Sequence, residues 1–201
     1  MFKKPALTQV MIHEPLAQRW SGRAFDPVQP VTRSQLLALL EAARWAPSCY
    51  GDQPWRYLVW DRMQDAVNWQ RAFACLGEFN QGWAGKAPVL MLAAADKRFN
   101  HNDQINRWGE YDAGAASMSL CVQATVLGLM THQMGGFDAG KAQQEFSIPE
   151  RFTPMAMIAV GYQLAEADIP PDVREREFAA RQRRPPGEVA FSGEWGRGIA
   201  P

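Results

Sequence analysis

The chain has 201 residues, 47% of them hydrophobic and 21% charged, which is typical of a folded globular protein and too apolar for a disordered one. Twenty-one basic residues balance twenty-one acidic ones, so the overall charge does not favour a nucleic-acid partner. The three cysteines, Cys49, Cys75 and Cys121, form no Cys-x-x-Cys pair, which argues against a disulfide framework or a zinc site and fits a reducing cytoplasm.

Two segments bear on targeting and membranes. Residues 1–20 begin with a short basic stretch but contain no long apolar region, so they do not resemble a secretory signal. Residues 113–130 approach the length of a membrane span, but Ser117, Ser119 and Gln123 interrupt them. We expect this stretch to be a buried helix of a cytoplasmic protein without a membrane partner.

The first predicted helix covers residues 33–46. Thr32 and Gln35 have the spacing of a capping box, and apolar residues recur on one face of the segment that follows them. Pro47 then ends the helix because its ring cannot continue the hydrogen-bond pattern.

Further along the chain, apolar runs predict a sheet with helical cover. The predicted strands are residues 55–60, 88–95, 129–136 and 154–162. The predicted helices that cover them are 33–46, a long one near 111–128 and a shorter one near 139–147. Because the runs at 88–95 and 154–162 are apolar throughout, we expect those two strands to be buried on both faces.

The composition changes at about residue 165. Residues 1–165 show no internal repeat or linker and are expected to form one domain. Residues 166–201 are rich in charge, proline and glycine and contain one short strand-like piece, 188–193. Such a tail buries little surface by itself, so it is either disordered or held by something else, most simply a neighbouring subunit.

Three arginine-containing or glycine-containing segments are candidates for anion binding. Arg19, Ser21 and Arg23 alternate, so an extended backbone would direct all three side chains the same way, towards a phosphate or another planar anion. Arg181 and Arg183 alternate in the same manner in the tail. Residues 134–138 place two glycines before a predicted helix, where main-chain amides could face a flat ligand. Taken alone, each pattern also fits a solvated surface segment or a plain turn.

The loop after Pro47 is the fourth candidate. Ser48 offers a hydroxyl, Gly51 permits close approach, and Gln53 offers a donor and an acceptor. The loop also fits a simple helix-to-strand turn. Cys49 is more typical of a small buried residue than of a nucleophile, because no histidine lies near it in the sequence.

Taken in their order and separation along the chain, these four segments resemble the FMN-dependent nitroreductase family. The resemblance covers nearly the whole chain: Arg-x-Ser-x-Arg, then APS and QPW, then Asn80 followed by AP and a strand, then GGFD, and finally RxRxP. It implies an α+β fold in which helices flank a central, mostly antiparallel sheet. It also implies that residues 1–165 form a flavin-binding core and that the protein is a homodimer. In this dimer, residues 166–201 of each chain wrap the partner subunit.

The resemblance further implies the residues of an FMN site. The implied cofactor-binding residues are Arg19, Trp20, Ser21, Arg23, Pro47, Ser48, Cys49, Gly51, Gln53, Asn80, Met134, Gly135, Gly136, Arg181 and Arg183. Arg19 and Ser21 would hold the phosphate together with the two tail arginines, which are expected to reach over from the partner chain. Arg23 would lie near the pyrimidine end of the flavin, and the Gly135 amide would face flavin N5.

Two positions depart from the family pattern. Gly51 stands where many members carry asparagine, and Trp83 stands where some members carry a second cation near flavin N1. We therefore expect binding to survive and the redox potential to differ. Trp108 and Tyr111 are expected to shape the substrate side.

The implied activity is a ping-pong oxidoreductase that takes hydride from NAD(P)H at flavin N5 and reduces a nitroaromatic, a quinone or a similar small acceptor. The sequence leaves the acceptor and the choice between NADH and NADPH open. Two alternatives from other classes also remain: a flavin-binding redox sensor or reservoir with little turnover, and a cofactor-free module whose residues 174–184 bind an anionic partner.

Overall fold

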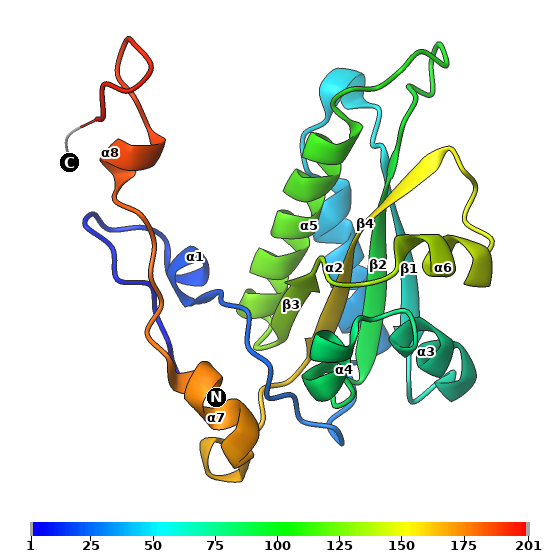
Figure 1. Ribbon diagram of the computed structural model, residues 1–201, viewed down its shortest axis with the longest axis vertical. Helices are drawn as coiled ribbons and strands as arrows, with labels where there is room; N and C mark the ends of the chain where they lie inside the picture. Colours follow the sequence, from blue (N-terminus) through cyan, green and yellow to red (C-terminus); the bar gives the residue numbers. More distant parts are fainter. Residues whose placement is uncertain (1, 200–201) are drawn as a thin grey trace.

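Four strands form one sheet in the order β1-β2-β4-β3, and each neighbouring pair is antiparallel. They are β1 Trp55–Asp61, β2 Val89–Asp96, β3 Met130–Met134 and β4 Phe152–Gly161. The computed structural model describes residues 2–199, and within them all four predicted strands are present. The predicted α+β class with a central antiparallel sheet is therefore confirmed (Figure 1).

Helices lie on both faces of this sheet (Figure 1). The α-helices of the described residues are α1 Glu14–Gln18, α2 Arg33–Arg44, α3 Ala66–Phe73, α4 Glu78–Ala84, α5 Gly109–Val126, α6 Ala139–Glu145, α7 Pro171–Phe178 and α8 Pro186–Val189, of which α2 and α5 cover one face of the sheet and α3 and α4 the other. The three predicted helices correspond to α2, α5 and α6. The predicted capping box also forms, because Thr32 Oγ1 accepts from the Gln35 amide while the Gln35 side chain accepts from the Thr32 amide.

Strand β2 separates two hydrophobic cores. Its odd-numbered residues, such as Met91, pack with α2 and α5, whereas Leu90 and Leu92 pack with α3 and α4. Trp69 and Trp83 supply much of the second core. Because both faces are covered, every residue of β2 is buried, as its continuous apolar run predicts.

Helix α5 is the long apolar segment of the sequence. It packs against α2 and the sheet through residues such as Ala116 and Leu120, which are fully buried. Tyr111, Met118 and Val126 leave an apolar stripe exposed on its other side. Among residues 2–199, no helix combines the length and the apolarity needed to cross a bilayer.

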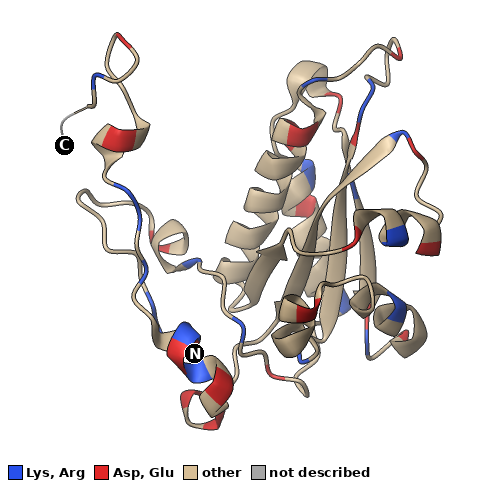
Figure 2. Ribbon diagram, viewed as in Figure 1, with Lys and Arg blue, Asp and Glu red and all other residues tan. Residues whose placement is uncertain are grey.

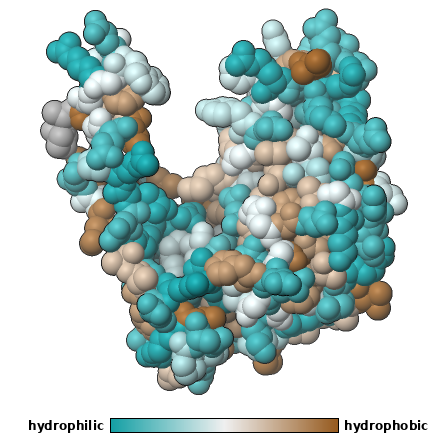
Figure 3. Space-filling model, viewed as in Figure 1, coloured by the Kyte–Doolittle hydropathy of each residue, from teal (hydrophilic) through white to brown (hydrophobic). Residues whose placement is uncertain are grey.

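After β4 the chain leaves the body as the C-terminal arm, residues 166–199. The arm contains α7 and α8, runs beside the N-terminal segment that includes α1, and stands away from the sheet (Figures 1 and 3). The prediction of a strand at 188–193 was wrong: α8 occupies its beginning, and only a single bridge joins Phe191 to Gly198. Pro185 and Pro186 favour the start of a helix because their fixed φ suits a first turn.

Candidate functional site

The arginine segment, residues 19–23, alternates between the inside and the outside of the molecule. Trp20 and Gly22 are buried, while Ser21 is exposed and Arg19 is partly exposed. Arg19 Nη1 donates to Ser21 Oγ at 3.4 Å, so these two side chains meet on one side. The alternation expected from the sequence is therefore present in the structure. It places the Arg19 guanidinium and the Ser21 hydroxyl side by side on the accessible side of the segment.

Arg23 lies on two aromatic rings. Its guanidinium carbon is 5.8 Å from the centroid of Trp83 and 6.0 Å from that of Phe79. Burial lowers the pKa of Arg23, and the nearby Arg176 lowers it further. Within the described residues its buried Nε has no hydrogen-bond partner. A partly buried cation with an unused, buried donor is suited to an acceptor that the protein itself does not provide.

The glycine turn, Gly135 and Gly136, follows β3 and has an exposed main chain. Asn80 Nδ2 donates to the Gly136 carbonyl oxygen at 2.9 Å, and the Gly77 amide donates to the same oxygen at 3.0 Å. A Cβ on Gly136 would lie 2.9 Å from Asn80 Nδ2, so a side chain here would displace the amide group that supports the turn. Asn80 was predicted to contact the flavin, and within this chain its amide group supports the turn.

The ends of the glycine turn are anchored in the protein. Met134 is buried at the end of β3. Asp138 caps α6, since its Oδ1 accepts from the Lys141 amide at 2.8 Å. The residues on both sides of the turn are therefore fixed, and the main-chain groups of Gly135 and Gly136 are exposed between them.

The proline loop, residues 47–53, is held in an unusual backbone conformation. Tyr50, Gly51 and Gln53 have φ values of 55°, 65° and 50°, in the left-handed region that non-glycine residues rarely adopt. The Ser48 hydroxyl accepts from the Gln53 amide at 3.0 Å, and the Cys49 amide donates to Asp112 Oδ2 at 3.0 Å. These bonds tie the loop to itself and to the first turn of α5.

Within one chain the proline loop lies far from the arginine segment. The loop is tied to α5 at Asp112, whereas Gln133 of β3 reaches α5 at Cys121, and the neighbouring His132 contacts Gly22. At 1.5 Å per residue, Asp112 and Cys121 are about 14 Å apart along the helix axis. The structure thus brings the arginine segment, Trp83 and β3 together, and leaves the proline loop at the other end of α5.

His132 is a site residue that the sequence analysis missed. Its Nδ1 lies 3.0 Å from the Gly22 carbonyl oxygen, and its ring centroid is 4.4 Å from that of Trp83. Burial lowers its pKa to about 4, so the imidazole is neutral near pH 7. Because a carbonyl only accepts, Nδ1 carries the proton. The sequence does contain a signal for this position: in the predicted strand, His132 lies on the same face as Met130 and Met134, two residues away on either side.

Arg181 binds the main chain of its own subunit. Its Nη1 donates to the carbonyl oxygens of Lys4 at 2.8 Å and Ala17 at 2.6 Å, and its Nη2 donates to that of Arg19 at 2.9 Å. The expectation that Arg181 reaches Arg19 from the partner chain is corrected accordingly: the arm passes beside its own N-terminal segment, whose carbonyls accept from the guanidinium.

Arg183 is exposed, and its Nη1 donates to the neighbouring Gln182 carbonyl at 2.7 Å. It lies in the basic stretch between α7 and α8 (Figure 2). Its side chain is therefore not committed to the rest of the protein.

An antiparallel four-stranded sheet between two helical layers defines an α+β protein, and arginines gather beside the glycine turn at one edge of that sheet. The chain matches the Nitroreductase family over residues 16–162 and belongs to that family. It is 33% identical to a crystal structure described as an oxidoreductase containing FMN, with a TM-score of 0.87 over 95% of this chain and 96% of the other.

Other relatives are more distant or shorter. The major NAD(P)H-flavin oxidoreductase of Aliivibrio fischeri is 32% identical over 97 residues, which cover 48% of this chain and 44% of that protein. An uncharacterized 15.4 kDa protein of Mycolicibacterium smegmatis is 33% identical over 57% of this chain and 76% of the relative. A nitroreductase family protein of Clostridium difficile 630 shares the fold, with a TM-score of 0.67 at 23% identity over 92% of this chain and 99% of the other.

Proposed function

We propose that the protein is an FMN-dependent oxidoreductase that transfers electrons from NAD(P)H to a nitroaromatic, a quinone or a similar small acceptor. The observation that carries the proposal is the meeting of Arg19, Ser21 and Arg181 beside Arg23 and an exposed glycine turn. The family, and the FMN and NAD(P)H-flavin chemistry named for two relatives at above 30% identity, support it.

The residues fit the two ends of FMN. Arg19, Ser21 and the exposed Arg183 supply donors for the phosphate, a dianion for which guanidinium groups are well suited. Arg23, with its unused buried Nε, supplies a cation for the pyrimidine end of the ring. The Gly135 and Gly136 main chain lies open for the ring itself. Bound FMN would supply the reversible two-electron chemistry that links NAD(P)H to the acceptor.

The protein's own contribution would be to position the bound flavin and to stabilise the negative charge that develops on it. Arg23 favours negative charge at the pyrimidine end, and His132 remains neutral beside it, so it adds no second cation. Trp83 occupies the position of the second cation and packs on Phe25 instead. Donor and acceptor would use the same open face in turn, the ping-pong order, near the exposed side chains of Trp108 and Tyr111.

The separation within one chain supports a homodimer with shared sites. The proline loop of one subunit would complete the site formed by the arginine segment of the other, because the two lie at opposite ends of α5 in a single chain. The exposed stripe of Tyr111, Met118 and Val126 is the contact surface that such pairing would cover. Residues 166–201 would then wrap the partner beyond the point where Arg181 anchors the arm.

The experiment that tests this function is an absorption titration of the purified protein with FMN, followed by NADH or NADPH under anaerobic conditions. We expect flavin bands that bleach, and FMN to bind more tightly than riboflavin by at least about tenfold because riboflavin lacks the phosphate. Arg19→Ala should remove most of that preference, whereas Arg33→Ala, an exposed arginine on α2, should leave it unchanged.

Two outcomes would contradict the proposal. Flavin that binds but does not bleach would make the protein a redox sensor or reservoir. An absence of flavin binding would leave only the fold in common with the family.

A further inference from the structure

Glu177 is a carboxylate with no exposed surface, located in α7 of the C-terminal arm. Fully buried glutamates are rare unless they are paired or hydrogen-bonded. Helix α7 otherwise consists largely of exposed charged residues, so the burial of this one side chain needs an explanation.

The Glu177 carboxylate accepts hydrogen bonds from the main-chain amides of Arg23, the last residue of the arginine segment, and of Ala24, which follows it. Oε2 accepts from the Arg23 amide at 2.8 Å, and Oε1 accepts from the Ala24 amide at 3.3 Å. Lys4 Nζ donates to the Glu177 carbonyl oxygen at 2.7 Å. The carboxylate therefore fixes two consecutive peptide groups where the Arg23 side chain leaves the backbone.

Gly22 makes this approach feasible. A Cβ on Gly22 would lie 2.8 Å from Glu177 Oε1 and would clash with Met130 Sδ. A larger residue at position 22 would require Met130 and the Glu177 carboxylate to move. The glycine in RWSGR thus has a structural reason that involves the arm.

The charges around Glu177 come from the same region. Lys4 and Arg23 are the cations that act on its carboxylate, and both favour the charged form. Burial opposes them and raises the pKa of Glu177 above that of an exposed glutamate. Arg181, four residues further along the arm, donates to the carbonyl oxygens of Lys4 and Arg19, so the arm contacts the arginine segment at both Arg19 and Arg23.

We propose that Glu177 is a positioning residue for the flavin site. It fixes the backbone at Arg23 and Ala24 and thereby directs the Arg23 guanidinium towards the pyrimidine end of the flavin, so the first helix of the arm belongs to the flavin site of its own chain. This inference rests on the proposed function, since it specifies how one residue of that site is held.

The test is a double-mutant cycle between Glu177 and Arg23. The variants are Glu177→Gln, Arg23→Ala and the combination, and the measurements are the dissociation constant of FMN and the midpoint potential of the bound flavin. Glutamine keeps the size of the side chain but offers only one oxygen to two amides. We expect Glu177→Gln to weaken FMN binding at least about tenfold and to shift the potential in the same direction as Arg23→Ala does.

The cycle separates positioning from general stability. If Glu177 acts through Arg23, Glu177→Gln adds little in the Arg23→Ala background, whereas independent effects would add and would overturn the inference. Glu175→Gln, an exposed change on the same helix, serves as the matched control and should leave both measurements unchanged. Glu177→Asp, which is one methylene shorter, provides a milder variant if the glutamine variant folds poorly.

Failure of the inference is distinguishable from failure of the proposed function. If the native protein binds no FMN, both are overturned. If the native protein binds FMN and Arg23→Ala changes affinity and potential while Glu177→Gln changes neither, only the positioning role is overturned. In the flavin-free protein, faster hydrogen exchange at the Arg23 and Ala24 amides of Glu177→Gln is expected, and unchanged exchange would contradict the role.

Discussion

At the scale of single residues, His132 provides a pH dependence of stability. Its pKa is lowered to about 4 in the folded protein, against 6.5 for an unperturbed histidine. The unfolded chain therefore binds more protons between these values, and the stabilisation is fully present above pH 6.5 and is lost as the pH falls through about 4. The shift corresponds to about 3 kcal/mol.

We predict that the free energy of unfolding in urea falls as the pH is lowered from 7 to 4, and that His132→Asn removes most of this slope. Asparagine keeps an N–H donor for the Gly22 carbonyl but cannot titrate in this range. His13→Asn, a change at an exposed histidine, is the control. An equal slope in the native protein and in His132→Asn would show that other groups cause the pH dependence.

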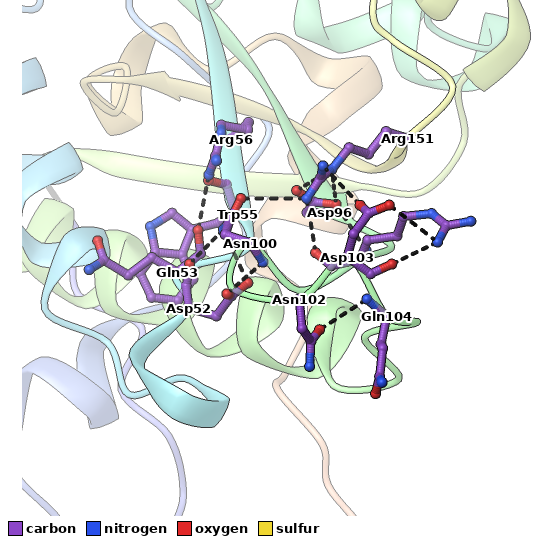
Figure 4. A network of polar contacts seen from close by, with 11 residues as sticks. Asp52, Gln53, Trp55, Arg56, Asp96, Asn100, Asn102, Asp103, Gln104 and Arg151 are labelled. Atoms are coloured by element: carbon purple, nitrogen blue, oxygen red, sulfur yellow. Dashed lines mark hydrogen bonds and ion pairs between the residues drawn. The ribbon is translucent and has the colours of Figure 1, made fainter.

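At the scale of elements, a polar network holds the loop between β2 and α5. Asp96, which is 1% exposed at the end of β2, accepts from Arg151 Nε through both oxygens at 2.7 and 2.8 Å. Further along the loop, the Asn100 amide donates to Asp52 Oδ1 at 2.8 Å (Figure 4). The network joins this loop to β4 and to the end of the proline loop.

Removing Arg151 leaves the buried Asp96 carboxylate without its cation, so we predict that Arg151→Ala lowers the free energy of unfolding by clearly more than Arg98→Ala does. The matched control is Arg98→Ala, because the pair of Arg98 and Asp103 is exposed on both sides and should contribute less than about 1 kcal/mol. Both are measured by urea unfolding at pH 7. Equal effects of the two substitutions would contradict the special role of Asp96.

The local parts of this structure were predictable, whereas the contacts between distant segments were not. The Thr32 capping box, the buried run of β2 and the alternation of Arg19 and Ser21 all follow from neighbouring residues. The bonds of Glu177 to Arg23 link positions far apart in the chain, and no local pattern indicates which segments meet. The same reason explains the misplaced partner of Arg181.

Some short elements escaped prediction for a different reason. Helices α3 and α4 are only 8 and 7 residues long, too short for a periodic apolar pattern to stand out. Asp65, whose side chain accepts from the Asn68 amide, was a usable start signal for α3. Its position after a strand and a turn made the segment resemble a loop.

At the scale of the whole molecule, we propose that a second chain completes the flavin site. The proline loop is tied to Asp112 in the first turn of α5, and the arginine segment lies beside β3 near the other end of the helix. If a two-fold axis relates the subunits, each flavin site would combine the loop of one chain with the arginines of the other. Size-exclusion chromatography with light scattering should then give twice the 22.5 kDa mass of the chain.

Mixing two inactive variants tests the shared site directly. Arg19→Glu damages the phosphate end, Gln53→Ala damages the loop, and each variant alone should bind little FMN. After unfolding and refolding together, half of the dimers are mixed, and one of the two sites in each mixed dimer has two native halves. We therefore expect FMN binding to return at about a quarter of all sites. No recovery, with each variant still dimeric, would mean that each site is built from a single chain, because a mixed dimer would then contain two damaged sites.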